Sequence, residues 1–252
     1  MTFAVAADGY DRFIGRYSRL LAPRFLQFSD VVDGPVLDVG CGPGFLTEVL
    51  VARFGAGQVA AIDPTVAFVE ACRLRTPGAD VRVGTAESLP FDAGRFGGAF
   101  FQLVLSFVSD APRAAAEASR VVRPGGSVAA CTWAADGFAL VQTFWRSASR
   151  FDPEAPDDAR LPLRREGELA TLWTEAGFKD VEGGTIDVEV GYANFGDFWE
   201  PFTIGGGPTT AYLLRQDARR RDQIRDACFE LLGSPAGPFR LPARALAIRG
   251  RR

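Results

Sequence analysis

The sequence predicts an α/β protein built on a doubly wound parallel sheet. Short apolar runs alternate with segments of helical spacing from residue 36 to residue 133, and a glycine-rich turn follows the first of these runs. A further run, Phe96–Leu105, is almost continuously apolar, as expected for a strand that helices cover on both faces. With 252 residues, of which 47% are apolar, the chain can form such a core.

The segment before the sheet predicts one or two amphipathic helices within the first thirty residues. Its apolar residues recur at helical spacing: Tyr10, Phe13, Ile14, Tyr17, Leu20 and Leu21. We expect no signal peptide, because the N-terminus has no long apolar run.

Residues 36–47 predict a strand, a tight turn and the start of a helix that runs to about Phe54. The turn glycines, Gly40, Gly42 and Gly44, are spaced G-x-G-x-G, whereas a dinucleotide fingerprint has G-x-G-x-x-G. Asp38 precedes them, and a carboxylate there repels a pyrophosphate but attracts an ammonium group. We therefore expect a nucleoside that carries a cationic amino acid. The alternative is a turn that only connects strand and helix.

The run Leu37–Gly44, LDVGCGPG, resembles the cofactor loop of class I S-adenosylmethionine-dependent methyltransferases, and the order of the later segments is similar to the small-molecule branch with a type-11-like domain. The resemblance implies a Rossmann-like sheet of seven strands, mostly parallel with one antiparallel strand at residues 244–249, and a helical cap. It implies S-adenosyl-L-methionine as cofactor and S-adenosyl-L-homocysteine as product. The loop residues implied to bind the cofactor are Asp38, Gly40, Cys41, Gly42 and Gly44.

The same resemblance makes Tyr17 a candidate lid residue over the cofactor, with Tyr10 behind it. Ordinary packing of both tyrosines is the alternative interpretation.

A second strand, Gln58–Ile62, ends in Asp63 and Pro64, which we also assign to the cofactor site. Asp63 lies 23 positions after Gly40, close to the separation of about 20 at which an acidic residue meets a ribose. One carboxylate can accept hydrogen bonds from both ribose hydroxyls. Alternatively, Asp63 only caps the helix that starts at Val66.

The third strand, Val81–Val83, leads to three candidate adenine contacts, Thr85, Ala86 and Glu87. The family usually has an Asp where this chain has Thr85. The Thr85 hydroxyl can still accept a hydrogen bond, the Ala86 backbone can donate one, and Glu87 can supply the missing carboxylate. At the open end of the fourth strand, Gln102 is expected to face the methionine part of the cofactor, with simple strand packing as the alternative.

The rest of the chain predicts a helix at Pro112–Val122, a turn at Arg123–Gly126 and a fifth strand at Ser127–Trp133. A helix at Glu166–Ala176 and a strand at Thr185–Val190 follow. We expect one domain, 1–252, with residues 1–30 as an N-terminal helical cap, 31–133 as the cofactor-binding core, 134–165 and 191–240 as substrate-cap insertions, and 166–190 and 241–252 completing the sheet.

Aromatic residues in the two insertions predict the acceptor site, since flat side chains suit an apolar or aromatic small molecule. The candidates are Phe107, Trp145, Trp199, Phe202 and Tyr212. The alternative for each is a place in the core of the cap itself.

Methyl transfer from a sulfonium is a direct displacement that needs mainly positioning, so we assign no catalytic residue. The chain has no histidine, so a base would have to be a carboxylate such as Asp197 or Glu200, a tyrosine such as Tyr212, or water. The predicted function is transfer of a methyl group to O, N or C of a small-molecule acceptor.

The composition excludes several partners. A net charge of −3 and a pI of about 5.2 indicate no general affinity for nucleic acid or an anionic membrane. Four scattered cysteines without histidine predict no metal site and fit a reducing, cytoplasmic location.

Three alternatives stay open. The departures from the family pattern at Thr85, Gly97 and Ala134 are compatible with a catalytically silent protein that binds S-adenosylmethionine or S-adenosylhomocysteine. A nicotinamide (NAD)-dependent oxidoreductase shares the sheet and an acidic ribose residue. A methyltransferase acting on RNA or protein is the third, and the acidic pI argues against RNA.

Overall fold

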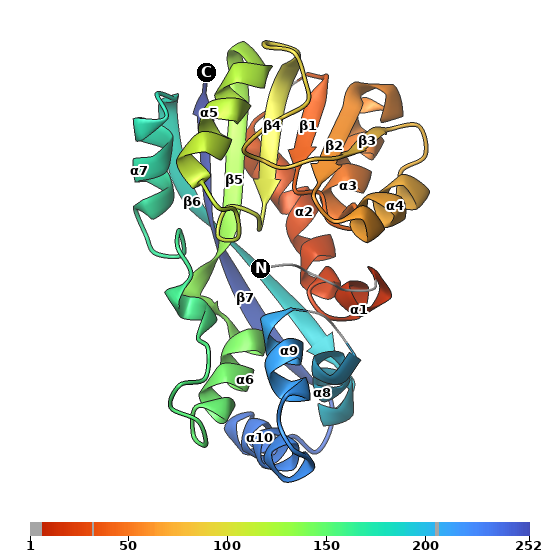
Figure 1. The fold of residues 1–252 in the computed structure, drawn as a ribbon, viewed down its shortest axis with the longest axis vertical. Coiled ribbons are helices and arrows are strands. Elements are labelled where there is room, and N and C mark those ends of the chain that lie inside the picture. Colours follow the sequence, from red (N-terminus) through yellow and green to blue (C-terminus); the bar gives the residue numbers. More distant parts are fainter. Residues whose placement is uncertain (1–6, 32, 205–206) are drawn as a thin grey trace.

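The computed structural model describes residues 7–31, 33–204 and 207–252 and contains one seven-stranded sheet with helices on both faces (Figure 1). The strand order is β3-β2-β1-β4-β5-β7-β6. The strands are β1 (Val36–Val39), β2 (Val59–Asp63), β3 (Asp80–Val83), β4 (Phe96–Gln102), β5 (Val122–Phe138), β6 (Lys179–Tyr192) and β7 (Phe239–Arg251).

Only β7 is antiparallel to its neighbours within this described sheet: it pairs antiparallel with β5 and β6, whereas β1 to β5 pair in parallel. The prediction of a Rossmann-like, mostly parallel sheet of seven strands with one antiparallel member is therefore confirmed.

Some helices cover the two faces of the sheet, and others form a separate cap. Those of the first part are α1 (Ala7–Arg12), α2 (Gly15–Ser29), α3 (Phe45–Phe54), α4 (Val66–Arg75) and α5 (Ala111–Val121), with the short 3₁₀ turn η1 (Ala56–Gln58). The later ones are α6 (Ala139–Ala148), η2 (Asp158–Arg160), α7 (Glu168–Glu175), α8 (Phe195–Ile204), α9 (Pro208–Leu214) and α10 (Ala218–Leu231). The long strands β5, β6 and β7 run down to α6, α8, α9 and α10, which gather in the lower part of Figure 1.

The observed limits of strands and helices match the predicted ones where neighbouring residues in the sequence set the boundary. β1 and α3 have the predicted limits, whereas β4 ends three residues before Leu105. The reason is Leu103, whose φ of 62° turns the chain while its backbone N–H donates a hydrogen bond to the carbonyl of Cys131 (2.9 Å).

Strands β6 and β7 are longer than predicted because they pair with each other from Lys179–Arg251 to Tyr192–Phe239. β5 includes the segment Arg123–Gly126, where we expected a turn. Gly125 has a φ of 77°, and the pairing of β5 with β7 begins at Ser127, the predicted strand start.

The core lies on both faces of the sheet. On one face, α2 packs through Tyr17, Leu21 and Phe25, and this cluster continues into the aromatic residues of the cap. The other face is covered by α5 and α7, with Trp173 fully buried. Residues 1–6 and 205–206, which belong to the predicted caps, lie outside the described residues.

Candidate functional site

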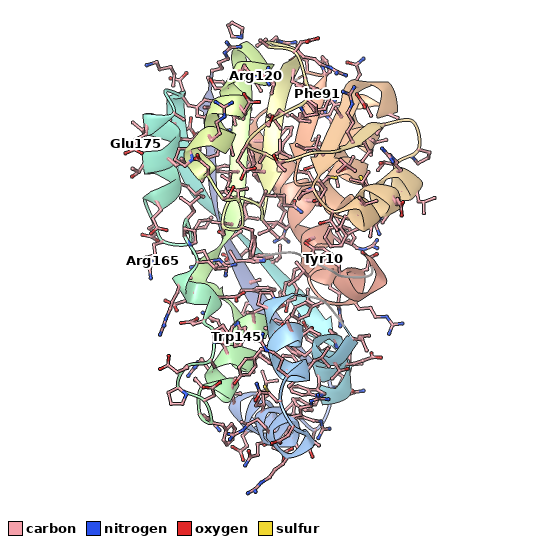
Figure 2. The ribbon with its side chains drawn as sticks, viewed as in Figure 1. Tyr10, Phe91, Arg120, Trp145, Arg165 and Glu175 are labelled. Carbon is pink, nitrogen blue, oxygen red and sulfur yellow. The ribbon has the colours of Figure 1, made fainter. Side chains whose placement is uncertain are left out.

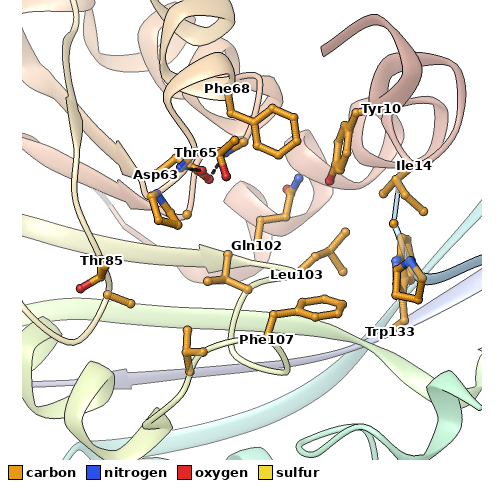
Figure 3. Close-up of a pocket in the computed structure, with 18 of the residues that line it drawn as sticks. Tyr10, Ile14, Asp63, Thr65, Phe68, Thr85, Gln102, Leu103, Phe107 and Trp133 are labelled. Atoms are coloured by element: carbon orange, nitrogen blue, oxygen red, sulfur yellow. Dashed lines mark hydrogen bonds between the residues drawn. The ribbon is translucent and has the colours of Figure 1, made fainter. Parts of the chain in front are cut away.

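A cavity of about 680 Å³ opens at the carboxyl ends of β1, β2, β3 and β4, where the sheet meets the N-terminal helices and the cap (Figure 3). Its walls come from the glycine turn, from the residues that follow each strand, from α1 and from the cap insertions. The volume lies within the range of roughly 300–1,000 Å³ that is usual for small-molecule sites.

The glycine turn contributes three positions with different reasons for glycine. All three have positive φ: 72° at Gly40, 54° at Gly42 and 95° at Gly44. An added Cβ would lie 2.5 Å from Val104 at Gly40 and 2.8 Å from the Cys72 sulfur at Gly44, but would meet nothing within 4 Å at Gly42. Gly40 and Gly44 therefore allow close packing, whereas Gly42 bares its backbone to the cavity.

Asp63 is held at the cavity wall by the backbone on two sides. Its Oδ2 accepts a hydrogen bond from the Gly42 N–H (2.9 Å), and its Oδ1 accepts one from the Thr65 N–H (2.8 Å), as Figure 3 shows in part. Burial raises the pKa of Asp63, while these two hydrogen bonds act to lower it. Each carboxylate oxygen has a second lone pair, so both can also accept from ligand hydroxyls.

Asp38 lies beneath the turn rather than on the wall. Only 1% of the residue is exposed, and its Oδ2 accepts a hydrogen bond from the Thr47 hydroxyl (2.7 Å). Its Oδ1 is buried and has no hydrogen-bond partner among the described residues. Burial raises the pKa of Asp38 to about 8. A cationic ligand would satisfy this oxygen and favour the ionised carboxylate.

The remaining predicted cofactor residues are divided between the wall and the interior. Pro64, Thr85, Ala86, Glu87, Gln102 and Tyr10 line the cavity, whereas Cys41 and Gly44 do not. Glu87 is already engaged, because its Oε1 accepts hydrogen bonds from the N–H (2.9 Å) and hydroxyl (2.8 Å) of Ser109. Although partial burial opposes them, these bonds lower the pKa of Glu87.

Gln102 and Tyr10 face the same space in Figure 3, close to Phe68. The Gln102 Oε1 is buried without a hydrogen-bond partner in the described part of the chain. The Tyr10 ring packs edge-on against Phe68, with ring centres 5.3 Å apart. A nucleoside with an amino acid group would lie against the bared backbone of Gly42 and would offer partners to the unpartnered oxygens of Asp38 and Gln102.

The structure does not bring Tyr17 to the cavity. Tyr17 is fully buried, and its hydroxyl shares a hydrogen bond of 3.0 Å with the hydroxyl of Tyr192. Its ring packs edge-on against Trp133 and Phe138. The helical face that carries Tyr17 is the one that packs on the sheet, so the N-terminal side of the cavity is formed instead by Tyr10, Phe13 and Ile14.

Of the five predicted acceptor residues, only Phe107 lines the cavity. The structure places Trp145, Trp199, Phe202 and Tyr212 in the interior of the cap, where the helices need a core of their own. The Phe202 ring is stacked on Phe144 at 4.9 Å, and Trp199 packs on the same ring at 6.4 Å.

Hydrogen bonds to carboxylates hold the other two aromatic residues of the cap, Trp145 and Tyr212. The Trp145 indole N–H donates to Asp158 (3.1 Å), and the Tyr212 hydroxyl donates to Asp152 (2.8 Å). Figure 2 shows Trp145 among the cap helices and Tyr10 at the junction between cap and sheet.

The apolar wall beside Phe107 comes from residues that the sequence did not single out for it: Leu103, Val104, Val108, Trp133, Phe138 and Val141. They lie near the carboxyl ends of β4 and β5, so the ends of the strands were the better signal. Trp133 and Phe138 are stacked on each other with ring centres 4.7 Å apart.

None of the three side chains considered as a base lies on the cavity. Asp197 pairs with Arg16 (2.9 Å), Glu200 pairs with Arg12 (3.3 Å), and Tyr212 is committed to Asp152. The cavity instead includes Asp158 and Arg164, from a loop rich in Pro, Asp and Arg that gave no site signal in the sequence.

Within the described ranges, no group of three or more Cys, Asp or Glu side chains is arranged to hold a metal ion. Over the same ranges, no helix has the length and apolar character needed to cross a membrane. All four cysteines are unpaired and buried.

Comparisons with known proteins find similarity to methyltransferases. Residues 37–130 match a family model described as a methyltransferase domain. The chain is 29% identical over 157 residues to the malonyl-[acyl-carrier protein] O-methyltransferase of Methylococcus capsulatus and 32% identical over 149 residues to that of Salmonella typhimurium. These matches cover 60% and 56% of this chain but only 57% and 59% of those relatives.

Solved structures share the fold along nearly the whole chain. A putative methyltransferase from Bacillus halodurans has a TM-score of 0.57 at 16% identity, covering 91% of this chain and 97% of that one. The geranyl diphosphate C-methyltransferase of Streptomyces coelicolor has a TM-score of 0.54 at 14% identity, covering 92% and 78%.

Together, the matched segment, the sheet and the glycine turn support the prediction of a class I S-adenosylmethionine-dependent methyltransferase. The matched residues 37–130 include Leu37–Gly44, the run from which this prediction was made. An NAD-dependent oxidoreductase and a catalytically silent protein are not favoured.

Proposed function

We propose that this chain transfers a methyl group from S-adenosylmethionine to an apolar or aromatic small molecule. One observation carries the proposal: a single cavity joins Gly42 and Asp63 to the apolar wall of Phe107, Trp133 and Phe138. A ligand held at the strand ends and an acceptor held against that wall would therefore share one enclosed space.

The cofactor would be held by residues at the strand ends. Asp38, from beneath the turn, would attract the ammonium group by its charge, and Asp63 would take the ribose hydroxyls beside the bared backbone of Gly42. The backbone N–H of Ala86 and the Thr85 hydroxyl would meet the adenine, and Gln102 would meet the methionine part. The unpartnered oxygens of Asp38 and Gln102 support this arrangement, because buried polar atoms rarely lack a partner.

When bound, the sulfonium supplies a methyl group that is already activated for direct displacement. The chain would then act mainly by positioning: Trp133, Phe138 and Phe107 hold the acceptor and exclude water from it. Correct positioning can contribute roughly 7–11 kcal/mol in favourable cases, which is enough to be the main effect. The faces of these rings also stabilise a nearby cation.

The acceptor of the curated relatives, by their names, is a malonyl group on an acyl-carrier protein. For this chain we propose a free small molecule, because the acceptor end of the cavity has a largely apolar wall to which cap residues such as Val141 and Pro208 contribute. We also propose that residues 1–252 act as one domain with the cap segments described above, in the cytoplasm, where four unpaired cysteines are stable.

Two assays test this function. We expect S-adenosylmethionine, and not NAD, to raise the melting temperature of the protein. We also expect formation of S-adenosylhomocysteine when the enzyme is supplied with a library of apolar and aromatic acceptors. Stabilisation by NAD alone would contradict the proposal. Stabilisation by S-adenosylmethionine without turnover on any acceptor would favour a silent binding protein.

A further inference from the structure

A buried arginine lies on the cavity wall with few partners. Arg164 lines the cavity, although only 5% of its side chain is exposed. Its backbone carbonyl accepts a hydrogen bond from Ala135 N–H (2.8 Å), which fixes the loop to the end of β5. Its Nε has no hydrogen-bond partner among the residues that the structure describes.

The carboxylate nearest to this guanidinium compensates it only in part. Asp158 Oδ2 lies 4.0 Å from Arg164 Nη1, which is too long for a hydrogen bond. Asp158 is held by the Trp145 indole N–H, so it is anchored toward the cap. Burial lowers the pKa of Arg164 and raises that of Asp158, because each charge is withdrawn from water. A buried charge is costly when one of its N–H groups, here Nε, has no hydrogen-bond partner among the described residues, which points to a further partner for the guanidinium.

A second unpartnered polar group reaches the same cavity from the other cap insertion. Thr209 is 2% exposed and lines the cavity, and its hydroxyl oxygen has no hydrogen-bond partner within the described part of the chain. Thr209 and Arg164 come from segments about 45 residues apart in sequence, so their convergence is a property of the fold rather than of one loop.

The contacts of Arg164 are compatible with an anionic oxygen group beside it. The Arg164 guanidinium carbon lies 5.8 Å from the centre of the Phe107 ring, within the range of a cation–π contact. Guanidinium N–H groups match the paired oxygens of a carboxylate or phosphate, and a threonine hydroxyl can donate a further hydrogen bond.

We propose that Arg164 and Thr209 bind an anionic oxygen group, a carboxylate or a phosphate, on the methyl acceptor. This inference rests on the proposed function, since it places the acceptor in the cavity shared with the cofactor. The apolar part of the acceptor then lies against Phe107 and Trp133. Arg164 is thus a specificity-determining residue that selects an amphipathic acid over its neutral analogue.

The test uses three probes of similar shape: 4-phenylbutyrate, 2-phenylethyl phosphate and the neutral 4-phenylbutyramide. Each is titrated calorimetrically into the full-length protein, with and without saturating S-adenosylhomocysteine. We expect one or both anions to bind at least about tenfold more tightly than the amide. The tighter of the two anions identifies the group, carboxylate or phosphate.

Variants test which residues cause the preference for the anions over the amide. Arg164→Gln should abolish it, and Thr209→Val should weaken anion binding about threefold. Asp158→Asn removes the competing negative charge and should strengthen anion binding. Arg160→Gln is the matched control, because Arg160 lies on the same loop with 82% of its side chain exposed, and should change nothing.

Three results would overturn the subsite: equal binding of anions and amide by the unmodified protein, an unchanged preference in both Arg164→Gln and Thr209→Val, or no binding of any anionic probe. Failure of S-adenosylhomocysteine itself to bind counts against the proposed function instead. The titrations without it still decide the anion subsite in that case.

Discussion

The Asp63 carboxylate accepts a hydrogen bond from the backbone N–H of Gly42, with Oδ2 and nitrogen 2.9 Å apart. This bond ties the end of β2 to the glycine turn that follows β1. It fixes the carboxylate beside the one turn glycine whose missing Cβ leaves open space. The two features from which the sequence predicts a cofactor site are therefore one physical unit.

Replacing this carboxylate should weaken cofactor binding. In Asp63→Asn the amide nitrogen cannot accept from a backbone N–H, and the charge that would bind two ribose hydroxyls is lost. We expect the affinity for S-adenosylhomocysteine, measured by calorimetry, to fall at least about tenfold. Asp226→Asn, at a side chain that is 72% exposed, is the control and should leave the affinity unchanged.

Two alanine substitutions in the turn should have different effects. Gly40→Ala places a methyl group 2.5 Å from Val104, so we expect mainly a lower melting temperature. Gly42→Ala meets nothing within 4 Å, so beyond the cost of its positive φ, about 1–2 kcal/mol, its main effect should be on ligand affinity. Thermal unfolding and calorimetry on both variants separate the two. An unaltered ligand affinity in Gly42→Ala would argue that the ligand does not approach this backbone.

Cofactor binding should release a proton from Asp38. Burial raises the pKa of this carboxyl to about 8, so it is mostly protonated at pH 7 in the free protein. An ammonium group beside it lowers that pKa and favours ionisation. Calorimetry at pH 7 in buffers of different ionisation enthalpy should show release of up to about one proton on binding S-adenosylhomocysteine. In Asp38→Asn this release should disappear.

The raised pKa of Asp38 also predicts how the stability of the free protein depends on pH. Because the folded pKa of Asp38 lies above the unfolded value, its contribution is fully present below about pH 4 and is lost as the pH rises toward 8. Asp38→Asn should therefore flatten the fall in melting temperature over this window relative to the unmodified protein. An identical pH profile in the two proteins would show that Asp38 titrates normally.

Substitutions of the two tyrosines in the N-terminal helices should distinguish a packing role from a ligand-binding role. Tyr17→Phe removes the buried hydroxyl pair with Tyr192, so we expect a stability loss of about 1 kcal/mol and no change in ligand affinity. Tyr10→Ala opens the cavity wall and should weaken S-adenosylhomocysteine binding. Denaturant unfolding and calorimetry on both variants check this assignment. Weaker ligand binding in Tyr17→Phe would restore Tyr17 as a lid residue.

A similar pair tests the acceptor wall. Phe202 is fully buried and stacked on Phe144, so Phe202→Ala should cost about 3–5 kcal/mol of unfolding free energy. Phe107 lines the cavity, and Phe107→Ala should instead weaken the binding of 4-phenylbutyrate with a smaller loss of stability. Denaturant titrations report the first effect and calorimetry the second. Weaker binding of 4-phenylbutyrate in Phe202→Ala, together with a large loss of stability in Phe107→Ala, would place the acceptor site among the cap aromatic residues instead.

Several residues that the sequence assigns to the cofactor lie together on the cavity wall, because the signals for them are local. The turn at Gly40–Gly44 and the acidic residue at Asp63 are each set by a strand end and by a few neighbouring residues. In a parallel sheet, adjacent strand ends must lie at one edge. The bounds of β1 and α3 follow for the same reason.

The acceptor end could not be predicted in this way. Phe195, Phe198, Trp199 and Phe202 lie at helical spacing, but spacing alone does not say whether that face meets a cavity or another helix. Arg164 gave no signal, because its burial depends on Phe107 and Asp158, which the fold brings to it.

The most direct test is a crystal structure of the protein grown with S-adenosylhomocysteine. We predict electron density above the carboxyl ends of β1 and β2, with both ribose hydroxyls within hydrogen-bond distance of Asp63 and the ammonium group near Asp38. Density for the nucleoside at any other place on the sheet, with the Gly42–Asp63 region filled only by water, would contradict it.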